Sequence, residues 1–286
     1  MTILAEAHAS IDWAGLPRVE AAIGYLPRSA GRRVTLDFTG GYQPPRELIA
    51  TPIHDLSGVR DRLSIDREGF ALMPFGKASD PGNPAWVDTV WRPAAEDAVR
   101  RLSGASRTVS WEFNMRFSTR SPESRRTIVS RPADNAHSDF GPGQFVGTLA
   151  HPSPLAALAG TPPPRRWRCF NVWQAVSETP FDSALALCDS SSLDPDDMAF
   201  AYAPLRTGSG GDFLLELCQY RHNPAQRWGY VRDIRRDELL IFSGLDPAAG
   251  APWGAVPHTA FTDPGWRPGT PPRNSVELRV LALFDD

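Results

Sequence analysis

The chain has 286 residues, 41% of them hydrophobic, and a formal net charge of −3. This length suits one large core or two small domains, and we expect one domain over 1–286. The slightly acidic balance argues against nucleic-acid or membrane-surface partners, which usually require a basic excess. No stretch approaches the roughly 18 consecutive apolar residues of a membrane span, so we expect a cytoplasmic protein and leave its oligomeric state open.

The region from residue 1 to about 107 mixes short apolar runs with proline and glycine, and it contains one predicted helix over residues 83–104. Pro93 should bend or split this helix, because proline lacks the N–H that the helix interior needs. We expect the region to support the core from outside. The apolar positions of the helix follow a period near 3.6 residues: Trp86, Val90, Ala94 and Val99 or Leu102.

From Thr108 onward the chain consists of short runs rich in Val, Phe, Trp and Leu, separated by clusters of Pro, Gly, Asp and Ser. Such a pattern is typical of strands and turns. Without intervening helices, it favours an antiparallel sandwich or barrel over about 108–286. The predicted strands are 108–117, 167–176, 184–189, 212–220, 227–233, 238–244 and 275–284.

The three cysteines, Cys169, Cys188 and Cys218, are an odd number at wide spacing. They fit neither a disulfide framework nor a cysteine-based zinc site. We expect them to be reduced residues of the core, where a free cysteine behaves as a small hydrophobic residue.

A candidate metal site begins with His137 and Asp139, which are two residues apart. In an extended segment both side chains project from the same face. His258 follows about 120 residues later, and an antiparallel barrel can bring its strand beside the first. Two imidazoles and one carboxylate leave open positions on a metal, as in non-haem Fe(II) oxygenases. Taken alone, the short His-x-Asp pattern is more often a surface loop.

The segment after His258 adds a candidate anion-binding site. Arg273 and Ser275 open the last predicted strand, fifteen and seventeen residues after that histidine. A buried arginine offers a planar fork that matches a carboxylate, and the serine hydroxyl can donate a further hydrogen bond. The order of these residues is the one that 2-oxoglutarate oxygenases require. Arg279 shares the same strand parity and is a second candidate for the anchor or for a substrate carboxylate, and a surface ion pair is the simpler alternative for each arginine.

The other histidines, His8, His54, His151 and His222, have no partner at ligand spacing, so we expect structural or exposed positions for them. Asp189, Glu238 and Asp246 flank predicted strands and could compete for the metal, but none has a neighbouring histidine. Candidates for the wall of a substrate pocket are Met115, Arg116, Asn171, Trp173 and Trp228. For both tryptophans core packing explains the residue equally well, and Arg116 needs a charged partner if it is buried.

Several stretches, in order from about Leu63 to Phe284, carry a resemblance to a known family. They are LSIDREGFAL, FNMRFSTRS, HSDFGP, FNVWQAV, ALALCDSSSLDPDD, QRWGYVRDIRRDELLIFSGLDP, HTAFTDP and PRNSVELRVLALF. The chain resembles the gibberellin desaturase-like oxygenases of fungal and bacterial secondary metabolism, a group that includes one component of the cephamycin hydroxylation system.

This resemblance implies a mainly β fold with a double-stranded β-helix (jelly-roll, cupin-like) core and supporting N-terminal helices. It also implies dependence on Fe(II), 2-oxoglutarate and dioxygen. The metal positions fall on His137, Asp139 and His258, and the C-terminal arginine signature falls on Arg273 and Arg279. One departure stands out: such proteins often read Asn-Val-Trp-Arg-Pro where this chain has Gln174 and Ala175, which removes a cation that could face substrate or co-substrate.

The sequence therefore predicts an Fe(II)/2-oxoglutarate-dependent dioxygenase that oxidises an unactivated C–H bond of a small molecule by hydroxylation, desaturation or cyclisation. Two alternatives use the same fold. A cupin-like metal-dependent isomerase or hydrolase would work without a co-substrate and would not need Arg273. A non-catalytic binding protein would tolerate the loss of iron.

Overall fold

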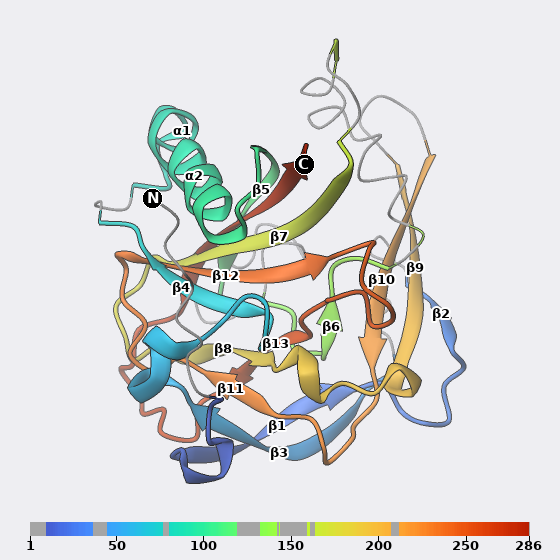
Figure 1. Cartoon of the computed structure of the whole chain (residues 1–286). Helices are drawn as coiled ribbons and strands as arrows, with labels where there is room; N and C mark the ends of the chain where they lie inside the picture. Colours follow the sequence, from blue (N-terminus) through green and yellow to red (C-terminus); the bar gives the residue numbers. More distant parts are fainter. Residues whose placement is uncertain are drawn as a thin grey trace.

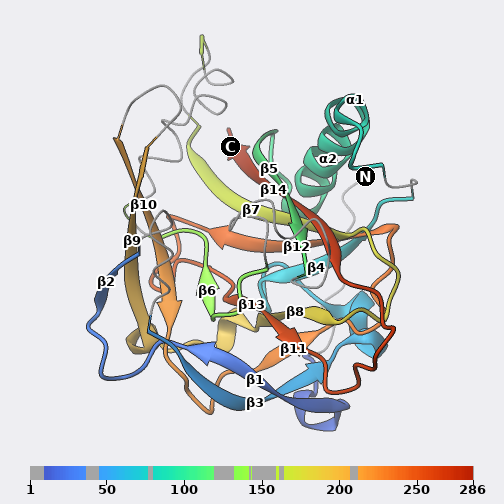
Figure 2. The same cartoon turned by 180° about the vertical axis from the view of Figure 1, so that it is seen from behind.

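The computed structural model describes residues 10–36, 45–76, 80–118, 132–141, 143, 159–160, 164–206 and 212–285. Two curved β-sheets pack face to face in it, and one helical segment covers the outer side of the smaller sheet (Figures 1 and 2). This arrangement confirms the expected mainly β, jelly-roll fold. Among the described residues, no helix combines the length and the apolar character needed to cross a membrane.

The larger sheet has nine strands, and two neighbouring central strands carry the two predicted histidine ligands. Adjacent strands are antiparallel except for the β11–β3 and β2–β9 pairs, which are parallel. In spatial order the strands are β1 (Arg18–Tyr25), β3 (Glu47–Asp55), β11 (Trp228–Tyr230), β8 (Ser183–Cys188), β13 (His258–Thr262), β6 (His137–Ser138), β10 (Asp212–Tyr220), β9 (Met198–Arg206) and β2 (Arg33–Thr35).

The smaller sheet has five antiparallel strands: β4 (Phe70–Pro74), β12 (Glu238–Leu245), β7 (Arg166–Ala175), β14 (Asn274–Phe284) and β5 (Arg107–Phe117). Because side chains alternate between the two faces of a strand, each central strand of this sheet contributes to two hydrophobic cores, one on each side of the sheet. On β14, Val276, Leu278 and Val280 pack toward the helix. Ser275, Glu277 and Arg279 share the opposite face, toward the larger sheet.

The predicted helix over 83–104 is divided into α1 (Pro84–Trp86), a π-helical turn over Val87–Trp91, and α2 (Arg92–Ser103). The N–H of Arg92 bonds to the carbonyl of Val87, five residues back, and Pro93 follows in the first turn of α2. The expected split at Pro93 is therefore confirmed. Short 3-10 helices lie at Trp13–Gly15, Ser57–Arg62, Ser190–Ser192 and Pro195–Asp197.

The buried face of this helical segment is shifted by one residue from the predicted face. The buried positions are Val87, Trp91, Ala95, Ala98 and Val99, and the last four share one cluster with residues of β7, β12 and β14. The predicted position Val99 is confirmed, whereas Trp86, Val90, Ala94 and Leu102 are only partly buried. The prediction was therefore wrong by one residue in the first part of the segment, where Val87, Trp91 and Ala95 are buried instead of Trp86, Val90 and Ala94.

All seven predicted strands are present, although the one expected over 227–233 is only three residues long. Further strands come from the region that we expected to support the core from outside. β1 and β3 belong to the larger sheet, and β4 pairs with β12 in the smaller one. Their sequences carry proline or glycine, which hid the alternation of apolar and polar residues. The three cysteines are free and buried, as predicted.

Candidate metal centre

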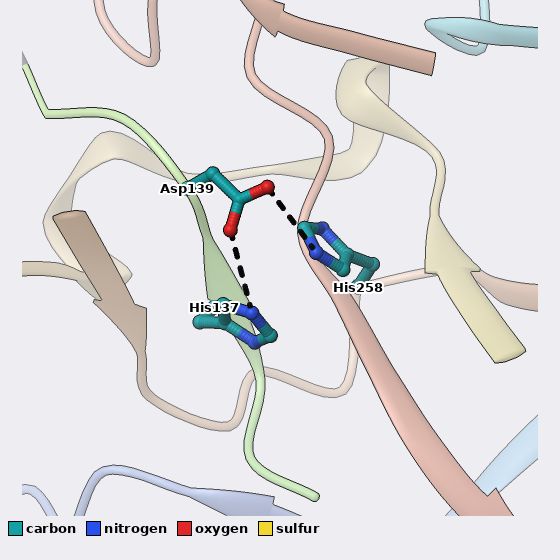
Figure 3. Close-up of side chains that lie close together, drawn as sticks. All are labelled: His137, Asp139 and His258. Atoms are coloured by element: carbon teal, nitrogen blue, oxygen red, sulfur yellow. Dashed lines mark ion pairs between the residues drawn. The ribbon is translucent and has the colours of Figure 1, made fainter. Parts of the chain in front are cut away.

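His137 and His258 lie directly opposite each other on two neighbouring strands, β6 and β13. Their ring centroids are 4.4 Å apart. Asp139 lies in the bend that follows β6, and its carboxylate points toward both rings (Figure 3). The topology of the larger sheet thus brings together three residues that are up to 121 positions apart in the sequence.

The facing atoms of these three side chains are the ones that bind metals. Nε2 of His137 lies 3.8 Å from Oδ1 of Asp139, and Nε2 of His258 lies 4.0 Å from Oδ2 (Figure 3). The Nδ1 atoms face backbone carbonyls, that of Asn135 at 2.8 Å and that of Val256 at 3.2 Å. These bonds place the ring protons on Nδ1 and leave both Nε2 lone pairs free for a shared ion.

Electrostatics favour the metal-binding protonation states of His137 and Asp139. Burial and the neighbouring His258 lower the pKa of His137 to about 4, so its imidazole is neutral at pH 7. Burial raises the pKa of Asp139, but the charge of Arg279, with a contribution from the neighbouring histidine rings, outweighs this effect and holds that pKa below its ordinary value. The donor set of two imidazoles and one carboxylate suits iron(II), with coordination positions left on one side.

A cavity of about 420 Å³, including its opening to solvent, begins at the triad and extends between the sheets. Arg116 and Glu277 lie in its wall, and Nε of Arg116 donates to Oε1 of Glu277 over 2.9 Å. Its described lining residues are Arg116, Pro132, Ala133, His137, Asp139, Trp173, Leu185, Phe242, His258, Ala260, Arg273 and Glu277. It therefore has both a charged wall and an apolar wall beside the metal ligands.

Arg273 is the most unusual charge in this cavity. It is only 2% exposed, and its Nε and Nη1 atoms have no hydrogen-bond partner among the described residues. The buried Oγ of Ser275 is also without a partner. Burial lowers the pKa of Arg273 to about 10, so it still carries its charge at pH 7. Buried donors without partners are costly, and this pair fits the carboxylate of a bound molecule.

Arg279 has a different environment, although it also faces inward from β14. It forms an ion pair with Glu112 of β5, and its Nη2 lies 3.5 Å from Oδ1 of Asp139. Its guanidinium carbon lies 5.1 Å from the ring centroid of Phe140. The two arginines that sequence reasoning could not separate are thus distinguished by their partners.

The predicted pocket residues fall into two groups. Arg116 and Trp173 line the large cavity, and Asn171 lines a smaller adjoining hollow of about 250 Å³ with Arg279 and Asp139. Met115 faces the opposite side of β5 and packs in the cluster beneath the helix. Trp228 is fully buried in the core between the sheets. Neither is among the described residues that line either space, so both are corrections to the predicted pocket.

Glu277 is the one charged residue in the described lining of the large cavity that the sequence analysis missed. It shares strand parity with Ser275 and Arg279, which was the available signal. It is also the partner that a buried Arg116 required. The pair joins β5 and β14 across the wall of the cavity, so Glu277 belongs to an internal ion pair rather than to a solvated face.

The Gln174 departure does not change the charge of the cavity. Gln174 points to the opposite face of β7, where its Oε1 accepts from the indole N–H of Trp91 over 2.6 Å. Its Nε2 donates to the backbone carbonyl of Arg236. Since neighbouring residues on a strand face opposite sides, Trp173 faces the cavity and residue 174 cannot. The expectation that a cation was lost from the site was therefore wrong.

The carboxylates and histidines considered as alternative metal ligands have other partners where the structure describes them. Asp189 pairs with Arg227, Glu238 with Arg60, and Asp246 with Arg168. The Nδ1 of His54 lies 3.1 Å from the carbonyl oxygen of Trp228, and His222 packs against Tyr25. His8 and His151 lie outside the described residues. Within the described part of the chain, the only group of three or more potential ligands is His137, Asp139 and His258.

Comparison with known proteins connects this geometry to oxygenases. The chain is 26% identical over 242 residues to the Fe(II)/2-oxoglutarate-dependent dioxygenase nvfI of Aspergillus novofumigatus, covering 80% of this chain and 81% of that one. It is 25% identical over 265 residues to the hydroxylase/desaturase poxK of Penicillium oxalicum, covering 82% and 79%.

A solved structure shows the same fold. The iron and alpha-ketoglutarate-dependent endoperoxidase NvfI superposes with a TM-score of 0.73 at 22% identity, over 94% of this chain and 99% of that one. The family model described as "Oxidoreductase/YMDC permease-like domain" matches residues 40–283, which is most of the chain. The chain therefore belongs to the oxidoreductase/YMDC permease-like domain family.

Proposed function

We propose that the chain is a non-haem Fe(II)/2-oxoglutarate-dependent dioxygenase that oxidises an unactivated C–H bond of a small molecule. One observation carries the proposal: a group of two histidines and one aspartate shares a cavity with a buried arginine whose Nε and Nη1 atoms have no partner in the described part of the chain. The names of the relatives, a dioxygenase and a hydroxylase/desaturase, support the same chemistry.

His137, Asp139 and His258 would hold the iron through Nε2, a carboxylate oxygen and Nε2. Arg273 and Ser275 would bind the distal carboxylate of 2-oxoglutarate by charge-assisted hydrogen bonds. With dioxygen, the bound iron would supply the oxidising chemistry, and 2-oxoglutarate would supply two electrons and leave as succinate and carbon dioxide. Trp173, Leu185 and Phe242 provide an apolar wall that excludes water from the co-substrate.

The two alternatives explain less. A metal-dependent isomerase or hydrolase, or a simple binding protein, gives no role to Nε and Nη1 of Arg273, which lack partners among the residues that the structure describes and are costly to bury without a ligand. We infer that Arg273 rather than Arg279 is the anchor, because Arg279 already pairs with Glu112.

The finer assignments are also proposals. We propose that the chain forms one oxygenase domain over 1–286 and belongs among the gibberellin desaturase-like enzymes of secondary metabolism. Hydroxylation, desaturation and cyclisation all start from the same C–H oxidation. A cytoplasmic location stays a prediction from the sequence.

The test measures succinate. Protein loaded with iron(II) without oxygen is mixed with 2-oxoglutarate and then exposed to oxygen, with a panel of amino-acid-derived, polyketide and terpenoid candidates. We expect succinate from the wild type and none above background from His137→Gln or Arg273→Met. The control His222→Gln, outside the site, should retain turnover. Absence of succinate from the wild type with every candidate would refute the proposal.

A further inference from the structure

We propose that Arg279 is a positioning residue that orients the Asp139 carboxylate for metal binding, and that Glu112 holds Arg279 in place. This inference rests on the proposed function, because it assigns Asp139 to the metal. It gives Arg279, within β14 and in the smaller hollow, a role different from that of Arg273, which precedes β14 and lines the larger cavity.

The contacts define a chain of alternating charges. Glu112 pairs with Arg279, and Nη2 of Arg279 lies 3.5 Å from Oδ1 of Asp139. The other carboxylate oxygen, Oδ2, faces His258 at 4.0 Å. The guanidinium thus lies beside one oxygen of the ligand, which limits rotation of the carboxylate. Groups that hold a metal ligand in this way commonly tune the affinity of the metal.

Packing restricts the guanidinium further. It stacks against the ring of Phe140, the residue directly after Asp139. Phe140 is itself held against the backbone of β12, because a Cβ on Gly244 would lie only 2.7 Å from Cε2 of the ring. Arg279 therefore contacts both the ligand and the residue that follows it.

The backbone of β5 is irregular at the point where Glu112 is needed. Glu277 pairs with Asn114 and Arg279 pairs with Trp111, so β5 has one residue more than β14 between these two pairs. Glu112 lies in this bulge with a φ of 54°, a left-handed conformation that non-glycine residues seldom adopt. Bulges redirect side chains and are frequent beside active sites. Here the bulge presents the carboxylate of Glu112 to Arg279.

The partners of the two arginines exclude a shared role. Arg273 has two N–H-bearing atoms without a partner among the described residues and can bind an incoming carboxylate. Arg279 lies between Glu112 and Asp139 and would have to leave one of them to bind 2-oxoglutarate. Arg279 consequently acts on the metal ligand, whereas Arg273 acts on the co-substrate.

The experiment measures binding of Mn(II), a redox-stable probe for the iron site, by equilibrium dialysis. The variants are Arg279→Gln, Arg279→Lys and Glu112→Gln. We expect the Mn(II) dissociation constant to rise roughly 10- to 100-fold in Arg279→Gln. Lysine should restore part of the loss because it keeps the charge without the fork, and Glu112→Gln should give a smaller loss.

A second readout separates this role from that of an anchor. The dissociation constant of 2-oxoglutarate, measured by calorimetry on Mn(II)-saturated protein, should change less than about threefold in the Arg279 variants. Arg60→Gln is the matched control, since Arg60 has a similar side-chain exposure of 20% against 17% for Arg279 and pairs with Glu238. It should bind Mn(II) like the wild type.

The outcomes are distinct. Unchanged Mn(II) affinity in Arg279→Gln, or loss of 2-oxoglutarate affinity alone, overturns the inference and leaves the proposed function standing. A wild-type protein that does not bind Mn(II) refutes both. Arg279→Gln could fail to fold, which circular dichroism would show. Glu112→Gln then provides the same test, because Arg279 loses the carboxylate that holds it beside Asp139.

Discussion

Replacing Arg273 with methionine should make the ligand-free protein more stable and should remove its affinity for 2-oxoglutarate. The guanidinium is buried, and its Nε and Nη1 atoms lack partners among the described residues. Methionine is also long and unbranched, so it can fill the same space without a charge. The two effects have opposite signs, which makes the prediction specific to a ligand-binding role.

The size of the stabilisation follows from the pKa of Arg273. Burial lowers this pKa to about 10, and a decrease of that size corresponds to roughly 3 kcal/mol of unfavourable free energy for the charged form in the folded chain. Removing the charge should recover about that amount. For a chain longer than 250 residues, this increase corresponds to a rise in Tm of roughly 6 °C.

The loss of binding should be larger. Two charge-assisted hydrogen bonds contribute roughly 1.5–3 kcal/mol each. Their removal should therefore weaken 2-oxoglutarate binding by roughly a hundredfold to ten-thousandfold. Calorimetry on the Mn(II)-loaded protein measures this affinity, and thermal and urea unfolding of the ligand-free protein measure the stability.

The matched control is Arg60→Met. Arg60 bonds to the buried carboxylate of Glu238, so its removal should destabilise the protein without affecting 2-oxoglutarate. The reasoning fails if Arg273→Met lowers the Tm in the way that Arg60→Met does, because Arg273 would then serve the fold. It also fails if the affinity for 2-oxoglutarate is unchanged.

Three further predictions concern pH and packing. Because the pKa of His137 in the folded chain is about 4, the unfolded chain binds an extra proton between about pH 6.5 and 4. The metal-free protein should therefore lose about 3 kcal/mol of unfolding free energy as the pH falls through this window. Urea unfolding should show the loss in the wild type and not in His137→Gln. Gly141→Ala should cost about 1–3 kcal/mol, since the new Cβ would lie 2.6 Å from Cγ of Glu216. Trp91→Phe should cost about 1–3 kcal/mol by leaving Oε1 of Gln174 without its donor, with no change in Mn(II) affinity.

Two comparisons make the packing predictions sharper. Gly58→Ala is the control for the glycine variant, because a Cβ at Gly58 meets nothing within 4 Å. A similar loss in both glycine variants would contradict the steric explanation. For the tryptophan variant, a change in Mn(II) affinity would contradict the assignment of Trp91 to the core beneath the helix.

The sequence predicted which residues would come together better than it predicted their surroundings. Residue type and order were sufficient to select His137, Asp139 and His258, which the structure brings into one group, because few side chains bind metals. Which of Arg273 and Arg279 lacks a partner depends on Glu112, whose direction is set by a bulge that has no clear signature in the sequence. Local alternation could show that neighbours face opposite sides, but not which side faces the cavity, and this explains the error at Gln174.

Whether a strand could be predicted depends on how much of its conformation is determined by its own residues rather than by its neighbours in the sheet. The apolar runs in β12 and in the second half of β14 are buried on both faces and are visible in the sequence. β1 and β3 begin with exposed residues and contain glycine or proline, so the sheet around them determines their conformation more than their own composition does. β6 is two residues long, and only its pairing with β10 and β13 makes it a strand.

The two sheets divide recognition of the reactants between them. Both histidines belong to the nine-stranded sheet, whereas Arg273 precedes β14 of the five-stranded sheet and Trp173, Glu277 and Asn171 lie within that sheet. Changes at positions of the five-stranded sheet other than Arg279 and its partner Glu112 could therefore alter the choice of reactant during evolution while the iron site keeps its shape. The same division offers engineers a scaffold in which selectivity can be redesigned on one layer and catalytic competence preserved on the other.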